Sequence, residues 1–91
     1  MKVADPAAYS DIVEIDTVSA FTALGKPFRG LIIVPTSGAA NITFNLTTTA
    51  NVVRSGLNFL IPANQTFILP IAGNDIILTA ATNVTKMYAV I

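Results

Sequence analysis

The stretch that decides the fold class is residues 41–47, Asn-Ile-Thr-Phe-Asn-Leu-Thr. Polar and apolar residues alternate without a break, which is the period-two pattern of a β-strand with one buried face. Ile42, Phe44 and Leu46 are therefore expected to face a core, while the Asn and Thr side chains face outward.

Shorter apolar segments on both sides of this stretch indicate further strands, because turn-forming residues separate them. These expected strands are residues 12–17, 29–34, 57–61, 66–71, 76–79 and 86–91. Ser55-Gly56 is expected to form the turn before residue 57. No segment has a convincing helical period. The sequence predicts an all-β fold, either a jelly-roll-like sandwich or a small barrel, of about seven to eight short antiparallel strands.

The chain is long enough for one domain, which we expect to span residues 12–91. Residues 1–11 contain Pro6 and mostly small side chains, which is typical of an extended N-terminal arm. The segment also lacks the apolar core of a signal peptide, so we expect synthesis and folding in a cytoplasm.

The composition is unusually poor in charge. Only 11% of the residues are charged and 53% are hydrophobic, whereas a typical soluble domain is about 25% charged. The remaining polarity comes mostly from eleven Thr and seven Asn residues. So much uncharged surface on a small protein indicates that a partner covers part of it.

Several expected strands are apolar on both faces, namely residues 31–34, 59–61, 67–69 and 76–78. A sandwich buries only the inner face of each sheet. A second copy of the chain around a symmetry axis could cover the outward side chains, and loops or the N-terminal segment could cover some of them. The expected interface residues are Tyr9, Ile12, Glu14, Asp16, Leu31, Ile33, Phe59, Ile68 and Ile77.

Missing residue types argue against catalysis. The chain has no Cys, His or Trp, so it lacks thiolate nucleophiles, the usual general base and the commonest transition-metal ligand. We therefore expect no enzymatic activity, no cofactor and no metal site. A net charge of zero without a basic cluster argues against nucleic acid, and the apolar runs are too short to span a membrane as a helix.

Four of the five acidic residues lie near the start of the chain: Asp5, Asp11, Glu14 and Asp16. A calcium loop or a catalytic carboxylate pair would be alternative uses for them. No Gly occurs before Gly25 to form a calcium loop, and we interpret these residues as a solvated or partner-facing edge.

Asn-x-Thr triplets begin at Asn41, Asn45, Asn64 and Asn83. They match the acceptor motif for N-glycosylation, but Asn and Thr two positions apart also share one face of a strand. We interpret them as a polar sheet face and turns. Such a face could also bind sugar, although the chain has few aromatic residues to stack on a sugar ring.

From Arg29 onward, the order of features resembles a group of small virion proteins of tailed bacteriophages, the head-decoration (cement) proteins and the base proteins of head or tail spikes. The resemblance covers roughly two-thirds of the chain. Its carrying stretches are Arg-Gly-Leu-Ile-Ile-Val at 29–34, Ser37-Gly38 before a Thr-rich strand, Asn-Phe at 58–59 leading to Pro62, Ile-Leu-Pro-Ile at 68–71, a Thr-rich turn at 79–85 and an apolar final strand. Where these proteins often have Gly after the equivalent of Pro62-Ala63, this chain has Asn64. Asn tolerates a positive φ, so we expect the turn to be preserved.

The resemblance implies a trimeric jelly-roll-like or sandwich subunit that decorates a capsid and bridges its capsomers. Its partners would be other copies of itself and the major capsid protein or another virion protein. The chain would then be made in the host bacterial cytoplasm and reside in the virion. The alternatives are the base or attachment protein of a head or tail spike or fibre, and a sugar- or receptor-binding β module.

Overall fold

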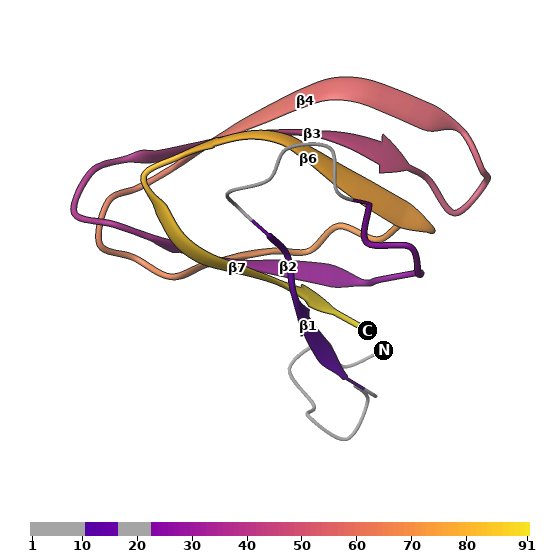
Figure 1. Cartoon of the computed structure of the whole chain (residues 1–91), viewed down its shortest axis with the longest axis horizontal. Helices are drawn as coiled ribbons and strands as arrows, with labels where there is room; N and C mark the ends of the chain where they lie inside the picture. The colour runs from indigo at the N-terminus through magenta and orange to yellow at the C-terminus, as the bar shows by residue number, and fades with distance from the viewer. Residues whose placement is uncertain (1–10, 17–22) are drawn as a thin grey trace.

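Seven β-strands make up the regular structure of the residues that the computed structural model describes, which are 11–16 and 23–91. In chain order they are β1 (Ile12–Glu14), β2 (Gly30–Pro35), β3 (Ala40–Thr47), β4 (Val53–Ile61), β5 (Phe67–Leu69), β6 (Asp75–Thr82) and β7 (Val84–Val90) (Figure 1). The all-β prediction is confirmed. Over the same ranges there is no helix long and apolar enough to cross a membrane.

The strands lie where the sequence predicts them but differ at their ends. β3 alternates between buried and more exposed residues along its whole length, as residues 41–47 indicate. β4 begins at Val53 rather than at Leu57, because Ser55-Gly56 forms a bulge inside the strand and not a turn before it. The pairing with β3 shifts at this point, and Gly56 has a φ of 68°. β1 ends at Glu14, earlier than expected.

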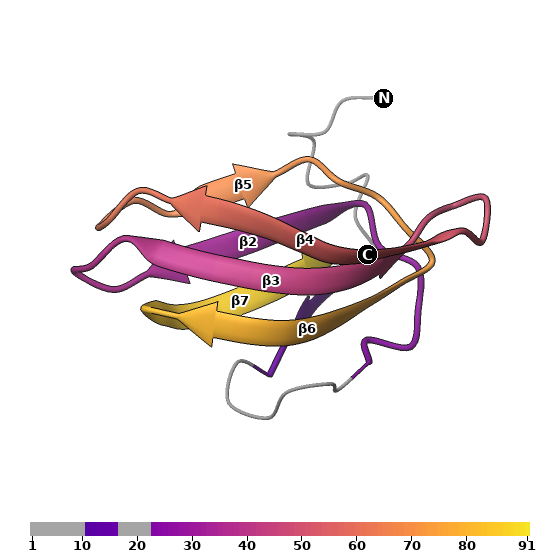
Figure 2. The same cartoon turned by 90° about the horizontal axis from the view of Figure 1, so that it is seen from above.

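The strands form two antiparallel sheets that lie face to face (Figures 1 and 2). Sheet A has the strand order β1-β7-β2-β5, and sheet B has the order β4-β3-β6. Figure 2 shows β4 and β5 along one side of the sandwich, with β6 and β7 toward the other. The pairing of the described strands does not close into a barrel.

The strand pairs are nested along the chain. β3 pairs with β4, β2 with β5, and β1 with β7. Between the last two pairs, Ala23 makes an isolated antiparallel bridge to Ile77 of β6, and the N–H of Leu24 donates to the carbonyl of Ile76 at 3.0 Å. The segment at Ala23 therefore occupies part of the outer edge of β6.

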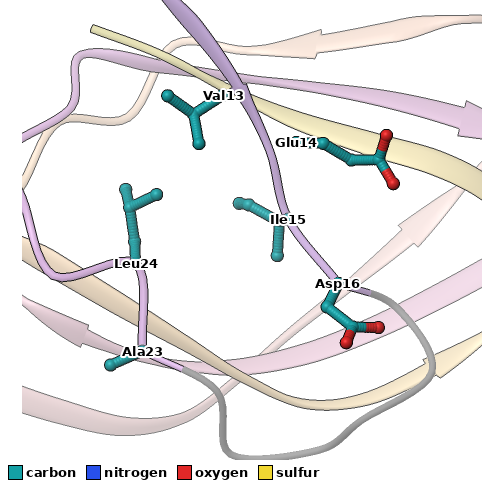
Figure 3. Close-up of a pocket in the computed structure, with 6 residues that line it drawn as sticks. All are labelled: Val13, Glu14, Ile15, Asp16, Ala23 and Leu24. Carbon is teal, nitrogen blue, oxygen red and sulfur yellow. The ribbon is translucent and has the colours of Figure 1, made fainter.

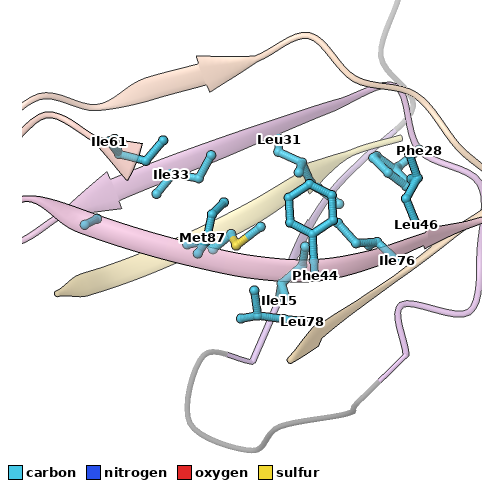
Figure 4. Close-up of a cluster of buried hydrophobic side chains, with 13 residues drawn as sticks. Ile15, Phe28, Leu31, Ile33, Phe44, Leu46, Ile61, Ile76, Leu78 and Met87 are labelled. Carbon is cyan, nitrogen blue, oxygen red and sulfur yellow. The ribbon is translucent and has the colours of Figure 1, made fainter. Parts of the chain in front are cut away.

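The core lies between the two sheets and is built from their inward side chains (Figure 4). Leu31 and Ile33 of β2, Ile42 and Phe44 of β3, and Met87 of β7 have no exposed surface. No buried residue of the described ranges is polar or charged. The interior between the sheets is therefore stabilised by apolar burial, at about 25 cal/mol per Å² of buried apolar surface.

Asparagine and glycine form the tight connections. Asn51, Asn64 and Asn83 have φ angles of 61°, 60° and 58°, which Asn adopts at lower cost than most residues. The expectation that Asn64 preserves its turn is confirmed. A Cβ atom on Gly73 would lie 2.6 Å from both a Leu46 methyl carbon and the Thr47 carbonyl oxygen, so this close approach requires glycine.

The boundary of the N-terminal arm differs slightly from the expectation. Residues 1–10 lie outside the described residues. Asp11, the last residue of the expected arm, belongs to the β domain, because its carbonyl accepts the N–H of Ile91 at 2.9 Å. β1 then adds to the edge of sheet A beside β7.

Candidate interaction surface

The outer side of sheet A carries a row of apolar side chains. Ile32 of β2 lies opposite Ile68 of β5 on one side and Tyr88 of β7 on the other. Val34, two residues further along β2, points to the same outer side of the sheet, and so does Ile12 on β1. We call these five residues, Ile12, Ile32, Val34, Ile68 and Tyr88, the apolar face.

Exposure is greatest at the two edges of the apolar face. Ile68 is 61% exposed and Ile12 is 53% exposed. Ile32, Val34 and Tyr88 are half-buried, because neighbouring strands flank them within the sheet. A flat partner could thus contact the whole row, with the largest gain in burial at the edge strands.

One ion pair accompanies the apolar face. Lys86 Nζ lies 3.3 Å from Glu14 Oε2, and both side chains are about half exposed. Glu14 lies opposite Tyr88, and Lys86 lies opposite Val34. The pair is worth only about 0–1 kcal/mol, but it makes this part of the surface electrically neutral.

The outer side of sheet B is more polar, although Leu60 and Ile77 also lie there. Its outward positions on β3 and β4 include a set of uncharged polar residues that we call the polar face: Asn41, Thr43, Asn45, Thr47 and Asn58. The Asn58 amide nitrogen donates to Asn41 Oδ1 at 2.5 Å, to Thr43 Oγ1 at 2.9 Å and to the Ile42 carbonyl at 3.2 Å. These bonds hold the three side chains in a defined arrangement.

The prediction that Leu31 and Ile33 are interface residues is wrong, because these two side chains of β2 point to the inner side of sheet A. Leu31 and Ile33 have no exposed surface and belong to the core, which leaves Ile32 and Val34 as the outward residues. Phe59 points inward as well: its ring stacks on Phe44 with centroids 5.6 Å apart, and it is only half-buried because β4 is an edge strand.

The other expected interface residues are divided between several places. Ile12, Glu14 and Ile68 share the outer side of sheet A, with Ile12 and Glu14 at the β1 edge and Ile68 at the β5 edge. Ile77 lies opposite Asn45 on sheet B, where it is half-buried. Asp16 is exposed beyond the end of β1. Tyr9 lies outside the described residues.

A small hollow lies between β1 and the segment at Ala23 (Figure 3). The side chains of Val13, Ile15 and Leu24 point toward one another there, and the carboxylates of Glu14 and Asp16 point away. Its volume of about 100 Å³ is below the range of about 300–1,000 Å³ that is usual for ligand pockets. Within residues 11–16 and 23–91, no three His, Cys, Asp or Glu side chains form a metal-binding group.

Comparison of the chain with protein-family models, with curated proteins and with solved structures found no match.

Proposed function

We propose that the chain is a non-enzymatic structural subunit that assembles into the virion of a tailed phage as a capsid decoration (cement) protein. The observation that carries this proposal is the apolar face, where Ile32, Ile68 and Tyr88 lie side by side on the outside of a sheet. An exposed row of this kind is typical of a surface that a partner covers. The resemblance from Arg29 onward supplies the identity of the particle.

The apolar face has a size suited to repeated contacts. The strands of sheet A have 3, 7, 6 and 3 residues. At about 3.3 Å per residue and about 4.8 Å between strands they cover roughly 300 Å², which is less than half of what each partner contributes to a standard interface. One such contact is weak, whereas a homotrimer that also touches the major capsid protein, or another virion protein, combines several. Such a subunit would bridge neighbouring capsomers and stabilise the head.

The nested strand pairs support a jelly-roll connectivity for this subunit. A jelly roll has eight strands in two sheets, and it can be described as a long hairpin of four nested strand pairs that is rolled into a sandwich. The pairs β3–β4, β2–β5, Ala23–β6 and β1–β7 follow this order. In this proposal the bridge at Ala23 stands for the second of the eight strands.

Light scattering of the purified chain at micromolar concentration tests assembly. We expect a homotrimer of the 9.5 kDa chain and expect Ile68→Asp to dissociate it, because a charge would be buried at the interface. Thr82→Asp is the matched control, since Thr82 is exposed on the outer side of sheet B. A wild-type chain that stays monomeric would rule the proposal out.

Co-purification of the chain with phage particles tests the location. A decoration protein is expected along the head lattice, where its removal lowers the temperature at which heads rupture. A spike or fibre base would be found at a few sites per particle, and its removal would leave head stability unchanged.

A sugar-binding β module is the second candidate, and the polar face is the observation that favours it. Asn58, Asn41 and Thr43 form an exposed, hydrogen-bonded and uncharged set, which suits the hydroxyl groups of a neutral glycan. Binding on a glycan array that Asn58→Ala abolishes would support this candidate, whereas a decoration protein is expected to give no signal.

A further inference from the structure

The edges of the two sheets differ in how they are protected against pairing with another strand. β1 and β5 have only three residues each, with a charged Glu14 on β1 and Pro70 directly after β5. The edge of β6 is partly occupied by Ala23. Short length, charge, proline and coverage are the usual means of blocking an edge strand.

β4 is the exception. It is an edge strand of nine residues, and nothing in the described part of the chain pairs with its outer edge. Its first half carries Arg54 and the bulge at Gly56. Its second half, Leu57–Ile61, has no charge, no proline and no bulge until Pro62 ends the strand.

β4 and β5 lie along one side of the sandwich (Figure 2), and apolar side chains remain accessible there. Phe67 is 36% exposed and Phe59 is half-buried, both on the inner side of their sheets, whereas Leu60, which is 71% exposed, lies next to this edge on the outer side of sheet B. On the opposite side, the segment at Ala23 lies along β6 and Leu24 packs against the core. No described segment does the same for β4 and β5.

We propose that β4 pairs antiparallel with β4 of a second copy across a twofold axis, which joins two copies of sheet B into one sheet. The bulge at Gly56 and Pro62 limit the usable edge to the five residues 57–61. Only one register pairs all five, with Phe59 opposite itself, Asn58 opposite Leu60 of the second copy, and Leu57 opposite its Ile61.

A second copy fits this edge better than a charged partner would. Two identical strands in antiparallel orientation place backbone donors opposite acceptors, and the uncharged stretch 57–61 does not repel its own copy. In the stated register, Leu57, Phe59 and Ile61 continue the inner apolar row from one copy to the next. A cross-strand pair of Phe59 rings adds a favourable contact at the axis.

The available area sets the strength of this contact. The five residues 57–61 are about 17 Å long, and two sheets about 10 Å apart with their side chains give a side about 15 Å wide. Two copies would bury roughly 500 Å², which is below the area of a standard interface. The pairing is therefore reversible in solution and reinforced within a larger assembly. It does not depend on the apolar face.

Single cysteines test the register, because the chain has no natural Cys. Asn58→Cys and Leu60→Cys variants, one carrying an affinity tag, are mixed and oxidised. Opposite residues have Cα atoms about 4.5–5.5 Å apart, within disulfide range, whereas 58–58 and 60–60 pairs would be more than about 7 Å apart. We expect the mixed 58–60 disulfide to form at least about 10-fold faster than either symmetric one. The proposal would be overturned if the mixed and the symmetric disulfides formed at equal rates. It would also be overturned if the mixed 58–60 disulfide formed no faster than the disulfide of a Thr43→Cys control.

A charge placed on the edge tests the affinity. The measurement uses chains that carry Ile68→Asp, which removes contacts through the apolar face. In these chains, Leu60→Lys should weaken the twofold association at least about 10-fold, as measured by sedimentation equilibrium. Val53→Lys is the matched control, because Val53 is 62% exposed on the same strand but lies beyond the bulge. Equal weakening by both variants, or by neither, would contradict the register. A chain with Ile68→Asp that no longer associates through the apolar face but still forms the 58–60 disulfide would show that the two interfaces are independent.

Discussion

The outer face of sheet A and the outer face of sheet B are built on the same alternating backbone but carry different chemistry. Ile32 has Ile68 and Tyr88 as its cross-strand neighbours, whereas Thr43 lies opposite Asn58 and hydrogen-bonds to it. The inward residues of the central strands are buried in both sheets, so the fold itself does not require either outer composition. We attribute the difference between the faces to the proposed assembly, in which only the apolar face is covered.

The largest expected effect separates inward from outward positions on one strand. Ile33→Ala should lower the free energy of unfolding by about 2–5 kcal/mol, because it leaves a cavity in the core. Ile32→Ala should lower it by only about 1 kcal/mol, because Ile32 is half-buried. Urea denaturation measures both values. Similar losses would mean that the outward side of sheet A is covered within the chain itself.

The next effect concerns assembly rather than folding. Replacing Ile32 and Ile68 together by Thr gives sheet A the outer composition of sheet B. We expect the association constant of the oligomer to fall at least about 10-fold, while the unfolding midpoint in urea changes little, because Thr is favourable in strands. Light scattering across a concentration series measures the association. If association persists, the apolar face is not the interface.

A smaller effect is expected on the polar face. Asn58→Ala removes the three hydrogen bonds donated by its amide. The groups left behind can bond to water, so the loss should be about 1 kcal/mol in the free energy of unfolding. Oligomer size should not change. A variant that dissociates the oligomer would assign the polar face to the interface and contradict the comparison.

The smallest effect belongs to the ion pair beside the apolar face. A double-mutant cycle with Glu14→Gln and Lys86→Gln should give a coupling free energy below about 1 kcal/mol, because both side chains are about half exposed. The coupling should shrink further in 1 M salt. A larger coupling in the wild-type oligomer than in the Ile68→Asp background, which lacks contacts through the apolar face, would show that a neighbouring copy buries the pair.

The local pattern of polar and apolar residues was sufficient to predict the positions of most of the strands. Residues 41–47 predicted the inward and outward sides of β3 correctly, because polar and apolar residues alternate there. The turn at Asn64 was predictable from the tolerance of Asn for positive φ. Ser55-Gly56 was misinterpreted as a turn, because a bulge and a turn use the same residue types and differ only in how the partner strand continues.

The phase of β2 could not be predicted in the same way. Leu-Ile-Ile-Val at 31–34 is apolar at every position, so no alternation distinguishes Leu31 and Ile33 from Ile32 and Val34. Their outward side is set by the register with β5 and β7. Ile32 and Val34 were missed as outward residues for this reason, although the apolar runs on both faces indicated that such residues exist.

The sequence by itself determined that this protein is an all-β chain with an apolar core, because alternation and turn chemistry are local properties that a single strand already expresses. It also determined that apolar residues exceed what one inner face can bury. Only the tertiary structure decided which of them face outward, and that within residues 11–16 and 23–91 no segment pairs with the long outer edge of β4. These features depend on which strands become neighbours, and pairing between residues far apart in the chain is not written in any one segment.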